Sequence, residues 1–437
     1  MHDLARLRDS LDGELFGPDS PGYDAVRGPA FPDIRPRLVV ACRSVSDVVG
    51  ATRYAAATGD RLVARGGGHC FAGRSATDGI VLDMSGLDRV SVGADGTATI
   101  GAGARLAQVY AALHAAGRTL PAGCGPTVGI AGLTLGGGIG LLGRVHGLTC
   151  DRLVGARVVL ADGSVVDCDD VREPDLFWAL RGAGGGQFGV VTSLRFATVA
   201  EPVTTRVEAH WSTIGSGEPV AAWQSWAPDA PDELTLNLTL VSEPGAPTRA
   251  TLFGAAVLAE GPTRDLLRQF LDRAGGSPTV DVRAGLPFGD LKSSFTDPRD
   301  ATAGALRNRS EFFSHPIADG TLAPLLTELG APRGTGARQL AFTAMAGAYN
   351  RVAADATAFA HRGERFLLEH IGAADDAWVD RSWSTAHSAG SGRVYPNFPD
   401  PALDGWAAAY HAGNYSRLAA VKAAYDPHRF FDFPQAI

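Results

Sequence analysis

Three clusters of glycine in the first half of the chain constrain its fold more than any other feature. They are RGGGH at 65–69, GIAGLTLGGGIG at 129–140 and RGAGGGQFG at 181–189. Backbone that lacks Cβ atoms can approach a phosphate closely, and successive N–H groups in such turns form anion-binding nests. None of the clusters has the GxGxxG or GxxxxGK[ST] spacing in a strand-to-helix context, which disfavours a nicotinamide Rossmann site and a P-loop. Three clusters in one region indicate a large, phosphate-containing cofactor.

The sequence around the first cluster predicts a βαβ unit. Two short apolar runs read as strands, and the segment between them has helical spacing and ends in glycine. The three segments are RPRLVVAC at 35–42, SVSDVVGATRYAAATG at 44–59 and RLVARGG at 61–67. Asp-Gly pairs that begin at Asp95 and Asp162 predict two hairpins farther along. The first half therefore has an α+β pattern.

The chain changes character near residue 200. Before that point, the segment 121–143 is too glycine-rich for a stable helix and too apolar for a solvated linker, so we expect an ordered, buried loop. After it the glycine clusters stop, and strand patterns such as LTLNLTLV at 234–241 alternate with helix patterns such as the one at 261–276. A second α+β domain is therefore predicted from about residue 201.

Composition excludes several classes of partner. With 39 basic and 47 acidic side chains the 437-residue chain has a net charge of −8, and no basic cluster stands out, so neither nucleic acid nor an anionic membrane surface is expected. The N-terminal sequence has no apolar signal-peptide core, and no apolar run is long enough to span a bilayer. Five scattered cysteines suggest no disulfide framework. We expect a cytoplasmic protein that acts on a small molecule, and the sequence does not predict its oligomeric state.

Four longer stretches resemble one known family, and they occur in the same order as in that family. The stretches are VARGGGHCFAGRSATDGIVLDMSGL (63–87), PTVGIAGLTLGGGIGLLGRVHGLTCD (126–151), DLFWALRGAGGGQFGVVTSL (175–194) and GNYSRLAAVKAAYDP (413–427). They are similar to the berberine bridge enzyme group of the vanillyl alcohol oxidase superfamily, whose bacterial members include 6-hydroxy-D-nicotine oxidase and secondary-metabolite oxidases. The resemblance runs through nearly the whole chain.

The resemblance implies a specific α+β architecture. It predicts a PCMH-type FAD-binding domain of two α+β subdomains over residues 1–200, with its core at about 34–200. A substrate domain with an antiparallel sheet flanked by helices is expected over 201–390. The remaining residues, 391–437, are expected to return to the FAD domain.

The resemblance also implies how FAD is attached. His69 ends the family's R-x-G-G-H motif, whose histidine is joined to the 8α-methyl group of the flavin. Such a bond withdraws electrons from the flavin and prevents its loss. Some members add a cysteine bond to flavin C6 immediately before the proline of PTVG, but here Gly125 has that place and Cys124 lies one residue earlier. Because a one-residue shift reverses side-chain direction in extended backbone, a single bond through His69 is the prediction, with Cys124 as a possible second link.

Further cofactor contacts follow from the family's motifs. The backbone of Gly66 to Gly68 is expected to hold the pyrophosphate, with Arg65 contributing at its edge. Later glycines are expected along the ribityl chain and ring, and a Gly-Val-Val segment at the adenosine. Val128 occupies a position where valine accompanies reactivity with oxygen in plant relatives. The predicted contacts are Arg65, Gly66, Gly67, Gly68, Val128, Gly129, Gly132, Gly136, Gly137, Gly138, Gly189, Val190, Val191, Tyr395, Asn397 and Asn414.

The group that accepts the substrate proton is the hardest to assign. It must stand beside the flavin and within hydrogen-bond reach of the substrate. Family members use a tyrosine, sometimes paired with an acid, or a glutamate on the substrate sheet. Tyr410 in AAYHAGNYSRL is the first candidate, with Tyr415 nearby in sequence, and Tyr349 in AGAYNRV is another. An ordinary phenol has a pKa of about 10, so any of the three needs a stabilising partner.

These features predict an FAD-dependent oxidase. It would remove hydride from a C–OH or C–N centre of a small molecule, with O2 as acceptor and H2O2 as product, in bacterial secondary metabolism. A sugar or glycoside oxidase and an alkaloid-type amine oxidase are the alternatives. A flavin dehydrogenase and a flavin-binding protein without turnover remain further possibilities. No metal site is predicted.

Overall fold

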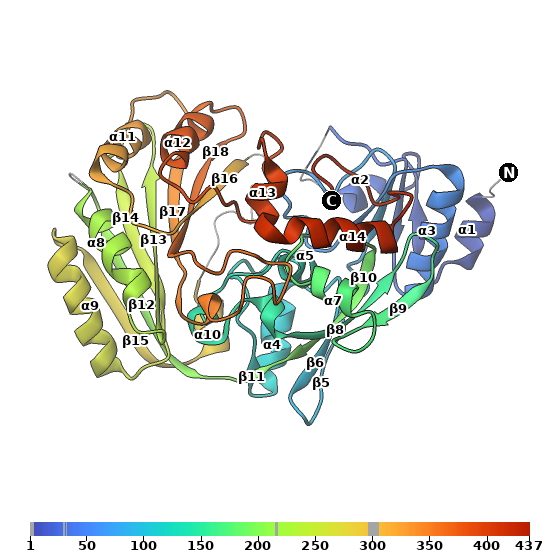
Figure 1. Cartoon of the computed structure of the whole chain (residues 1–437), viewed down its shortest axis with the longest axis horizontal. Coiled ribbons are helices and arrows are strands. Elements are labelled where there is room, and N and C mark those ends of the chain that lie inside the picture. The colour runs from blue at the N-terminus through green and yellow to red at the C-terminus, as the bar shows by residue number, and fades with distance from the viewer. Residues whose placement is uncertain (1–3, 29–30, 32, 215–216, 296–305) are drawn as a thin grey trace.

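The structure is a computed structural model that describes the chain except for residues 1–3, 29–30, 32, 215–216 and 296–305. The predicted α+β fold is confirmed, with sheets of four, five and seven strands and one two-stranded pair. Figure 1 shows the first two sheets at one side of the molecule, built from the first half of the chain, and the seven-stranded sheet at the other. The division into domains at residues 200 and 390 remains a prediction.

The four-stranded sheet contains the predicted βαβ unit. Its order is β1 (Glu14–Phe16), β2 (Leu38–Ala41), β4 (Ile80–Asp83) and β3 (Leu62–Arg65). β4 pairs in parallel with both β2 and β3, so it lies between the two predicted strands. Helices α1 (Leu4–Ser10), α2 (Tyr23–Arg27) and α3 (Val45–Thr58) belong to this part. Ser44 and Asp47 form a capping box at the start of α3, which explains why the helix begins there.

The five-stranded sheet carries both predicted hairpins. Its order is β5 (Val90–Val92), β6 (Thr97–Gly101), β10 (Val190–Ala197), β8 (Leu153–Val159) and β9 (Val165–Cys168). Other elements here are α4 (Leu106–Ala115), β7 (Arg118–Thr119), α7 (Pro174–Ala179) and β11 (Val199–Ala200). The segment 121–143, predicted as loop, is largely buried but includes α5 (Ile130–Leu135) and the start of α6 (Gly143–His146), followed by η1 (Thr149–Arg152). Apart from Gly132, helix α5 contains four apolar residues and one threonine. These residues are enough to form one short helix between glycines.

The seven-stranded antiparallel sheet separates a hydrophobic core from a polar face. Its order is β15 (Thr279–Pro287), β12 (Val203–Trp211), β14 (Arg249–Ala256), β13 (Leu234–Ser242), β17 (Arg338–Ala344), β18 (Phe366–Ala373) and β16 (Leu306–Phe313). Helices α8 (Glu218–Trp226), α9 (Glu260–Ala274), α11 (Asp319–Leu329) and α12 (Trp378–His387) cover its outer face in Figure 1. Residues alternate along β13, so its leucines join the core while Thr235, Asn237 and Thr239 point the other way. Shorter elements in this half are η2 (Ala227–Asp229), α10 (Phe288–Ser293) and η4 (Gly347–Asn350).

The last helix of the chain packs against its first half. The final elements are α13 (Trp406–His411), η5 (Ala412–Asn414) and α14 (Tyr415–Tyr425), and of these α14 contacts α7. Lys422 on α14 donates hydrogen bonds to the carbonyl oxygens of Gln187 at 2.5 Å and Phe431 at 2.7 Å, and pairs with Asp426 at 2.7 Å. Both charged side chains are at most 3% exposed. This ion pair therefore fastens the C-terminal segment to the third glycine cluster.

Replacing Lys422 by methionine is expected to lower the free energy of unfolding by about 3–5 kcal/mol, because it leaves Asp426 buried without its counter-charge. Urea titration followed by circular dichroism measures the change. Arg264→Ala is the control, because its pair with Glu260 on α9 is half-exposed and worth only about 0.3–0.5 kcal/mol. Equal effects of the two substitutions would contradict a special role of Lys422.

All five cysteines are free thiols. Across the described parts of the chain, no helix combines the length and the apolar character needed to cross a membrane.

Candidate functional site

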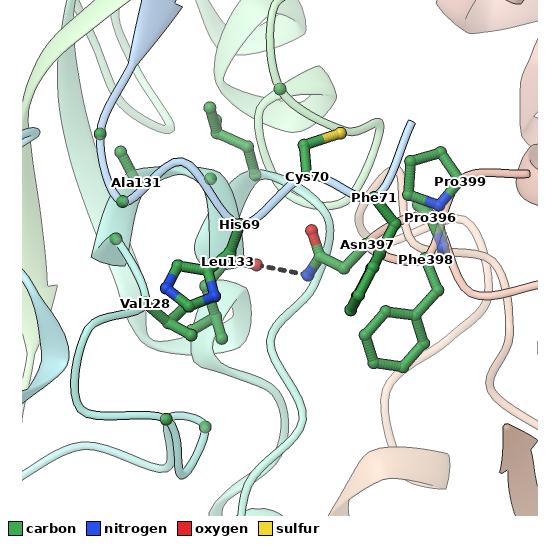
Figure 2. A pocket seen from close by; sticks show the side chains of 18 of the residues that line it. His69, Cys70, Phe71, Val128, Ala131, Leu133, Pro396, Asn397, Phe398 and Pro399 are labelled. Carbon is green, nitrogen blue, oxygen red and sulfur yellow. Dashed lines mark hydrogen bonds between the residues drawn. The ribbon is translucent and has the colours of Figure 1, made fainter. Parts of the chain in front are cut away.

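A cavity of about 400 Å³ lies where the glycine clusters meet the polar face of the seven-stranded sheet. All three clusters contribute to its wall, together with residues 395–399 and 431–433 of the C-terminal segment. In Figure 2, His69 and Val128 lie on one side, and the segment from Pro396 to Pro399 lies on the other. The cavity thus collects residues from almost the full length of the chain.

Two of the glycine clusters cross each other at the cavity wall. A Cβ atom on Gly67 would lie 2.2 Å from the backbone nitrogen of Gly129, and one on Gly129 would lie 2.4 Å from that of Gly67. Neither position can accept a side chain. Gly68 next to the crossing has a φ of +75°, which favours glycine. The bare backbone beside the cavity is the cradle that a phosphate-containing cofactor needs.

His69 follows this crossing and lines the cavity, as its predicted role requires. Its Nε2 lies 2.8 Å from Oγ1 of Thr127, so the threonine orients the imidazole ring. Val128, the next residue after that threonine, also lines the cavity. The half-buried histidine is therefore fixed in place by Thr127, two residues before the second cluster, rather than exposed on a free turn.

Cys124 lines the same cavity despite its shift of one position. It is half-buried and free, and glycine stands on each side of it. The backbone bends at Cys124, so the simple alternation of extended backbone does not hold here. Cys70, next to His69, is a second half-buried thiol at the wall.

Most of the predicted cofactor contacts lie at the cavity. They are Gly66, Gly67, Gly68, Val128, Gly129, Gly132, Gly189, Val190, Val191, Tyr395 and Asn397. Their residue types are small or apolar except for the last two, as expected for backbone that lies along a cofactor. The glycines among them place backbone without Cβ atoms along the cavity wall.

Four predicted contacts in the glycine clusters do not line the cavity and stabilise the fold around it. They are Arg65, Gly136, Gly137 and Gly138. Arg65 pairs with Asp83 at 3.0 Å and donates to the carbonyl oxygen of Arg27 at 2.6 Å, and it does not line the cavity. The three glycines are packing positions, since a Cβ atom would meet other side chains at 2.2–2.8 Å. The side chains met are those of Asn397, Phe359 and Thr149, respectively.

Tyr395 and Asn397 form a small hydrogen-bonded group at the cavity. The Tyr395 hydroxyl accepts hydrogen bonds from the backbone N–H of Gly138 at 3.0 Å and of Ile139 at 3.2 Å, and from Nδ2 of Asn397 at 2.9 Å. Asn397 also donates to the carbonyl oxygen of Leu133 at 2.8 Å, the dashed line in Figure 2. Burial raises the pKa of Tyr395 to about 12 although these donors lower it. The phenol therefore keeps its proton at neutral pH.

The structure does not bring Tyr410, Tyr415 or Tyr349 to the cavity wall. The Tyr410 hydroxyl accepts a hydrogen bond from Asp400 N at 2.8 Å inside a hydrophobic cluster, and burial raises its pKa to about 12. Tyr415 stacks on His411 at the start of α14. The Tyr349 hydroxyl donates to the carbonyl oxygen of Gly140 at 2.7 Å behind the wall, and burial raises its pKa. The expected role of these tyrosines as proton acceptors has no support in this geometry.

Asn414 is also away from the cavity. Its Nδ2 donates to the carbonyl oxygens of Ala354 at 2.7 Å and Thr357 at 3.1 Å, which ties the segment before α14 to the loop after η4. Its role in the described structure is to hold that loop.

Glu369 is the acidic residue that the sequence reasoning did not single out. It lies on β18, is only 5% exposed and lines the cavity. Nδ2 of Asn308 on β16 donates to its Oε2 at 2.7 Å. In the sequence, the sign of such a residue was an acidic side chain within the largely apolar strand FLLEHIGA. Carboxylates are rarely buried unless they have a partner or a function.

The sheet presents a polar but mostly uncharged wall around Glu369. The contributing side chains carry hydroxyl or amide groups and come from two neighbouring strands. They are Thr235, Asn237 and Thr239 of β13 and Gln339 and Thr343 of β17. Such groups can both donate and accept hydrogen bonds.

Two family models match the chain. The model described as an FAD binding domain matches residues 36–169, and the one described as berberine and berberine like matches residues 394–437. The chain is 32% identical to an FAD-linked oxidoreductase of Bacillus subtilis, itself uncharacterised, over 98% of this chain and 97% of that protein. It is 30% identical to the glucooligosaccharide oxidase of Sarocladium strictum over 97% of this chain and 91% of that enzyme.

Solved structures agree with these matches. BBE-like 1 of Physcomitrella patens has a TM-score of 0.90 at 26% identity and covers 100% of this chain and 99% of its own. The glucooligosaccharide oxidase of Acremonium strictum, described with 6-S-cysteinyl, 8α-N1-histidyl FAD, has a TM-score of 0.87 at 26% identity, with 99% and 98% covered.

Proposed function

The chain belongs to the berberine-like family of FAD-linked oxidoreductases, and we propose that it oxidises a C–OH group of a small, polar, uncharged molecule, with O2 as the electron acceptor. Its cofactor is FAD, which supplies a two-electron acceptor when bound. The proposal is carried by one observation: a buried carboxylate, a polar sheet face and the glycine cradle surround a single cavity. The products would be a carbonyl compound and H2O2.

Glu369 is the proposed proton acceptor. Oxidation of an alcohol carbon removes a hydride from carbon and a proton from its hydroxyl group, so a base must stand beside that hydroxyl. Glu369 reaches the cavity from the sheet, and Asn308 holds one of its oxygens. The carboxylate would therefore accept the proton of a substrate hydroxyl group in the cavity. Tyr395, which keeps its own proton, holds the backbone N–H of Gly138 by a hydrogen bond.

The polar wall supports a substrate with several hydroxyl groups. Thr235, Asn237 and Gln339 offer donors and acceptors, and the sheet face presents no arginine or lysine to the cavity among the described residues. Sugars have this chemistry, and the gluco- and chitooligosaccharide oxidases are relatives at 30% identity. An amine is the second candidate, because the Glu369 carboxylate could also bind an ammonium group.

His69 is the proposed site of covalent attachment, and Cys124 a proposed second one. Both line the cavity, and the relative described with histidyl and cysteinyl FAD has the same fold. Backbone of Gly66, Gly67 and Gly129 would hold the cofactor without side chains in the way.

The function is tested with the purified protein and a panel of mono- and oligosaccharides, cyclic amines and polyphenols. H2O2 production in air and bleaching of the flavin without air are measured for each compound. Peroxide with sugars supports the proposal, and peroxide with amines alone would favour the second candidate. Bleaching without peroxide formation in air would show a dehydrogenase.

Replacing Cys124 by serine is expected to shift the flavin absorption bands, because a sulfur atom on the ring is lost, while acid-precipitated protein stays yellow through His69. Cys70→Ser is the matched control, since Cys70 is also a half-buried thiol at the cavity. An unchanged spectrum in Cys124→Ser would show that there is no thioether.

A further inference from the structure

Arg74 is a positively charged residue at the cavity that the proposed function does not use. It lies five residues after His69, and among the described residues no other arginine and no lysine lines the cavity. Its Nη2 donates a hydrogen bond to Oε1 of Gln435 at 3.1 Å. Its guanidinium group lies over the ring of Phe433, 4.6 Å from the ring centroid. Both of these partners are uncharged.

The charge of Arg74 is left without an acidic partner in the described structure. None of the described carboxylates forms an ion pair with it, and Asp432 on the same wall pairs with Arg429 at 2.9 Å. Burial lowers the pKa of Arg74, although an arginine stays charged at any ordinary pH. A partly desolvated charge without a counter-ion is costly. The side chain is therefore suited to an anion that arrives through the cavity.

We propose that Arg74 is the counter-charge for the diphosphate of FAD. The diphosphate is the anionic part of the cofactor, and a guanidinium group can donate two parallel N–H bonds to phosphate oxygens. The first glycine cluster, which ends at His69, and Gly185 and Gly186 of the third cluster line the same cavity. Their backbone amides and Arg74 together would surround the diphosphate with donors.

The C-terminal segment fixes the position of the Arg74 guanidinium group through Gln435 and Phe433. While Gln435 accepts the bond from Arg74, its Nε2 donates to the carbonyl oxygens of Asp400 at 2.8 Å and Leu403 at 3.4 Å. Phe433 packs close to Gly186, where a Cβ atom would lie 3.6 Å from the phenyl ring. The guanidinium plane is thus fixed between a ring and an amide before any anion binds, which reduces the entropy lost on binding.

The experiment compares two flavins that differ in the diphosphate. Full-length protein with His69→Ala and Cys124→Ser binds flavin without covalent attachment, and Arg74→Gln and Arg74→Lys are added to it. Dissociation constants for FAD and riboflavin are measured by flavin fluorescence, and melting temperatures with and without each flavin give a second readout. We expect Arg74→Gln to weaken FAD binding by roughly tenfold or more, with riboflavin binding changed less than about twofold, and Arg74→Lys to lie between.

Two results would overturn the proposal. An equal loss of affinity for FAD and riboflavin would show that Arg74 only supports the shape of the cavity. Unchanged FAD affinity and unchanged thermal stabilisation by FAD would show that the diphosphate binds elsewhere. The proposal depends on FAD as the cofactor and not on the substrate, so a negative peroxide assay leaves it standing.

Discussion

Replacing Glu369 by glutamine will lower kcat by about 10²- to 10⁴-fold, the range typical for loss of a positioned general base. Glutamine has nearly the same size and can still accept the hydrogen bond from Asn308, so the sheet and the cavity keep their shape. The flavin content will therefore stay that of the parent protein. Stopped-flow measurement of flavin bleaching by substrate without air locates the loss in the step that removes hydride and proton.

Glu243→Gln is the control for this prediction. Glu243 lies on an exposed part of the same half of the chain and pairs with Arg249 at 3.1 Å, so the same chemical change there should leave kcat unaltered. Glu369→Gln with a kcat within threefold of the parent would remove Glu369 from the reaction. In that case Tyr395 would be the next titratable residue to test, because it also lines the cavity.

Removing both proposed attachment points will convert the flavin from fully acid-stable to fully extractable. In the His69→Ala, Cys124→Ser variant no side chain at the proposed attachment points remains to bond the flavin. Acid will then release the yellow colour into the supernatant, whereas the parent protein keeps it in the pellet. Absorbance of the two fractions measures the change, and kcat should fall because the bonded flavin has the higher potential.

His210→Ala controls for the loss of a histidine as such, because its side chain is 48% exposed on β12. Acid-stable colour in the double variant would place the bond on another residue. A parent protein that already releases its flavin in acid would contradict the His69 bond directly.

The local features of the fold could be predicted because short segments determine them. The βαβ unit, the two Asp-Gly hairpins and the alternation of β13 all depend on neighbours in sequence. The segment 121–143 was harder, since its short helix α5 depends on packing between glycine clusters. Alternation along β13 also separates its core leucines from Thr235 and Asn237, but the sequence does not show which face meets a cavity.

The residue that we propose as proton acceptor could not be predicted, because its role depends on which side chains the fold brings to one cavity. Tyr410 lies within a family motif, yet α13 turns it into a hydrophobic cluster. Glu369 has no motif around it and becomes significant only when β18 is placed beside β16 and β17. The Arg65 side chain, expected at the edge of the pyrophosphate, pairs with Asp83 and does not line the cavity.

The crossing of Gly67 and Gly129 has a consequence for the order of events during the protein's maturation. The two glycines are 62 positions apart, and the wall beside His69 exists only after their segments have met. A chain that has not completed this part of its fold has no cavity in which His69 could react with the cofactor. Covalent attachment at His69, once demonstrated, would mark each coloured molecule as one that had folded correctly, so the ratio of bound flavin to protein would serve as a count of properly folded chains.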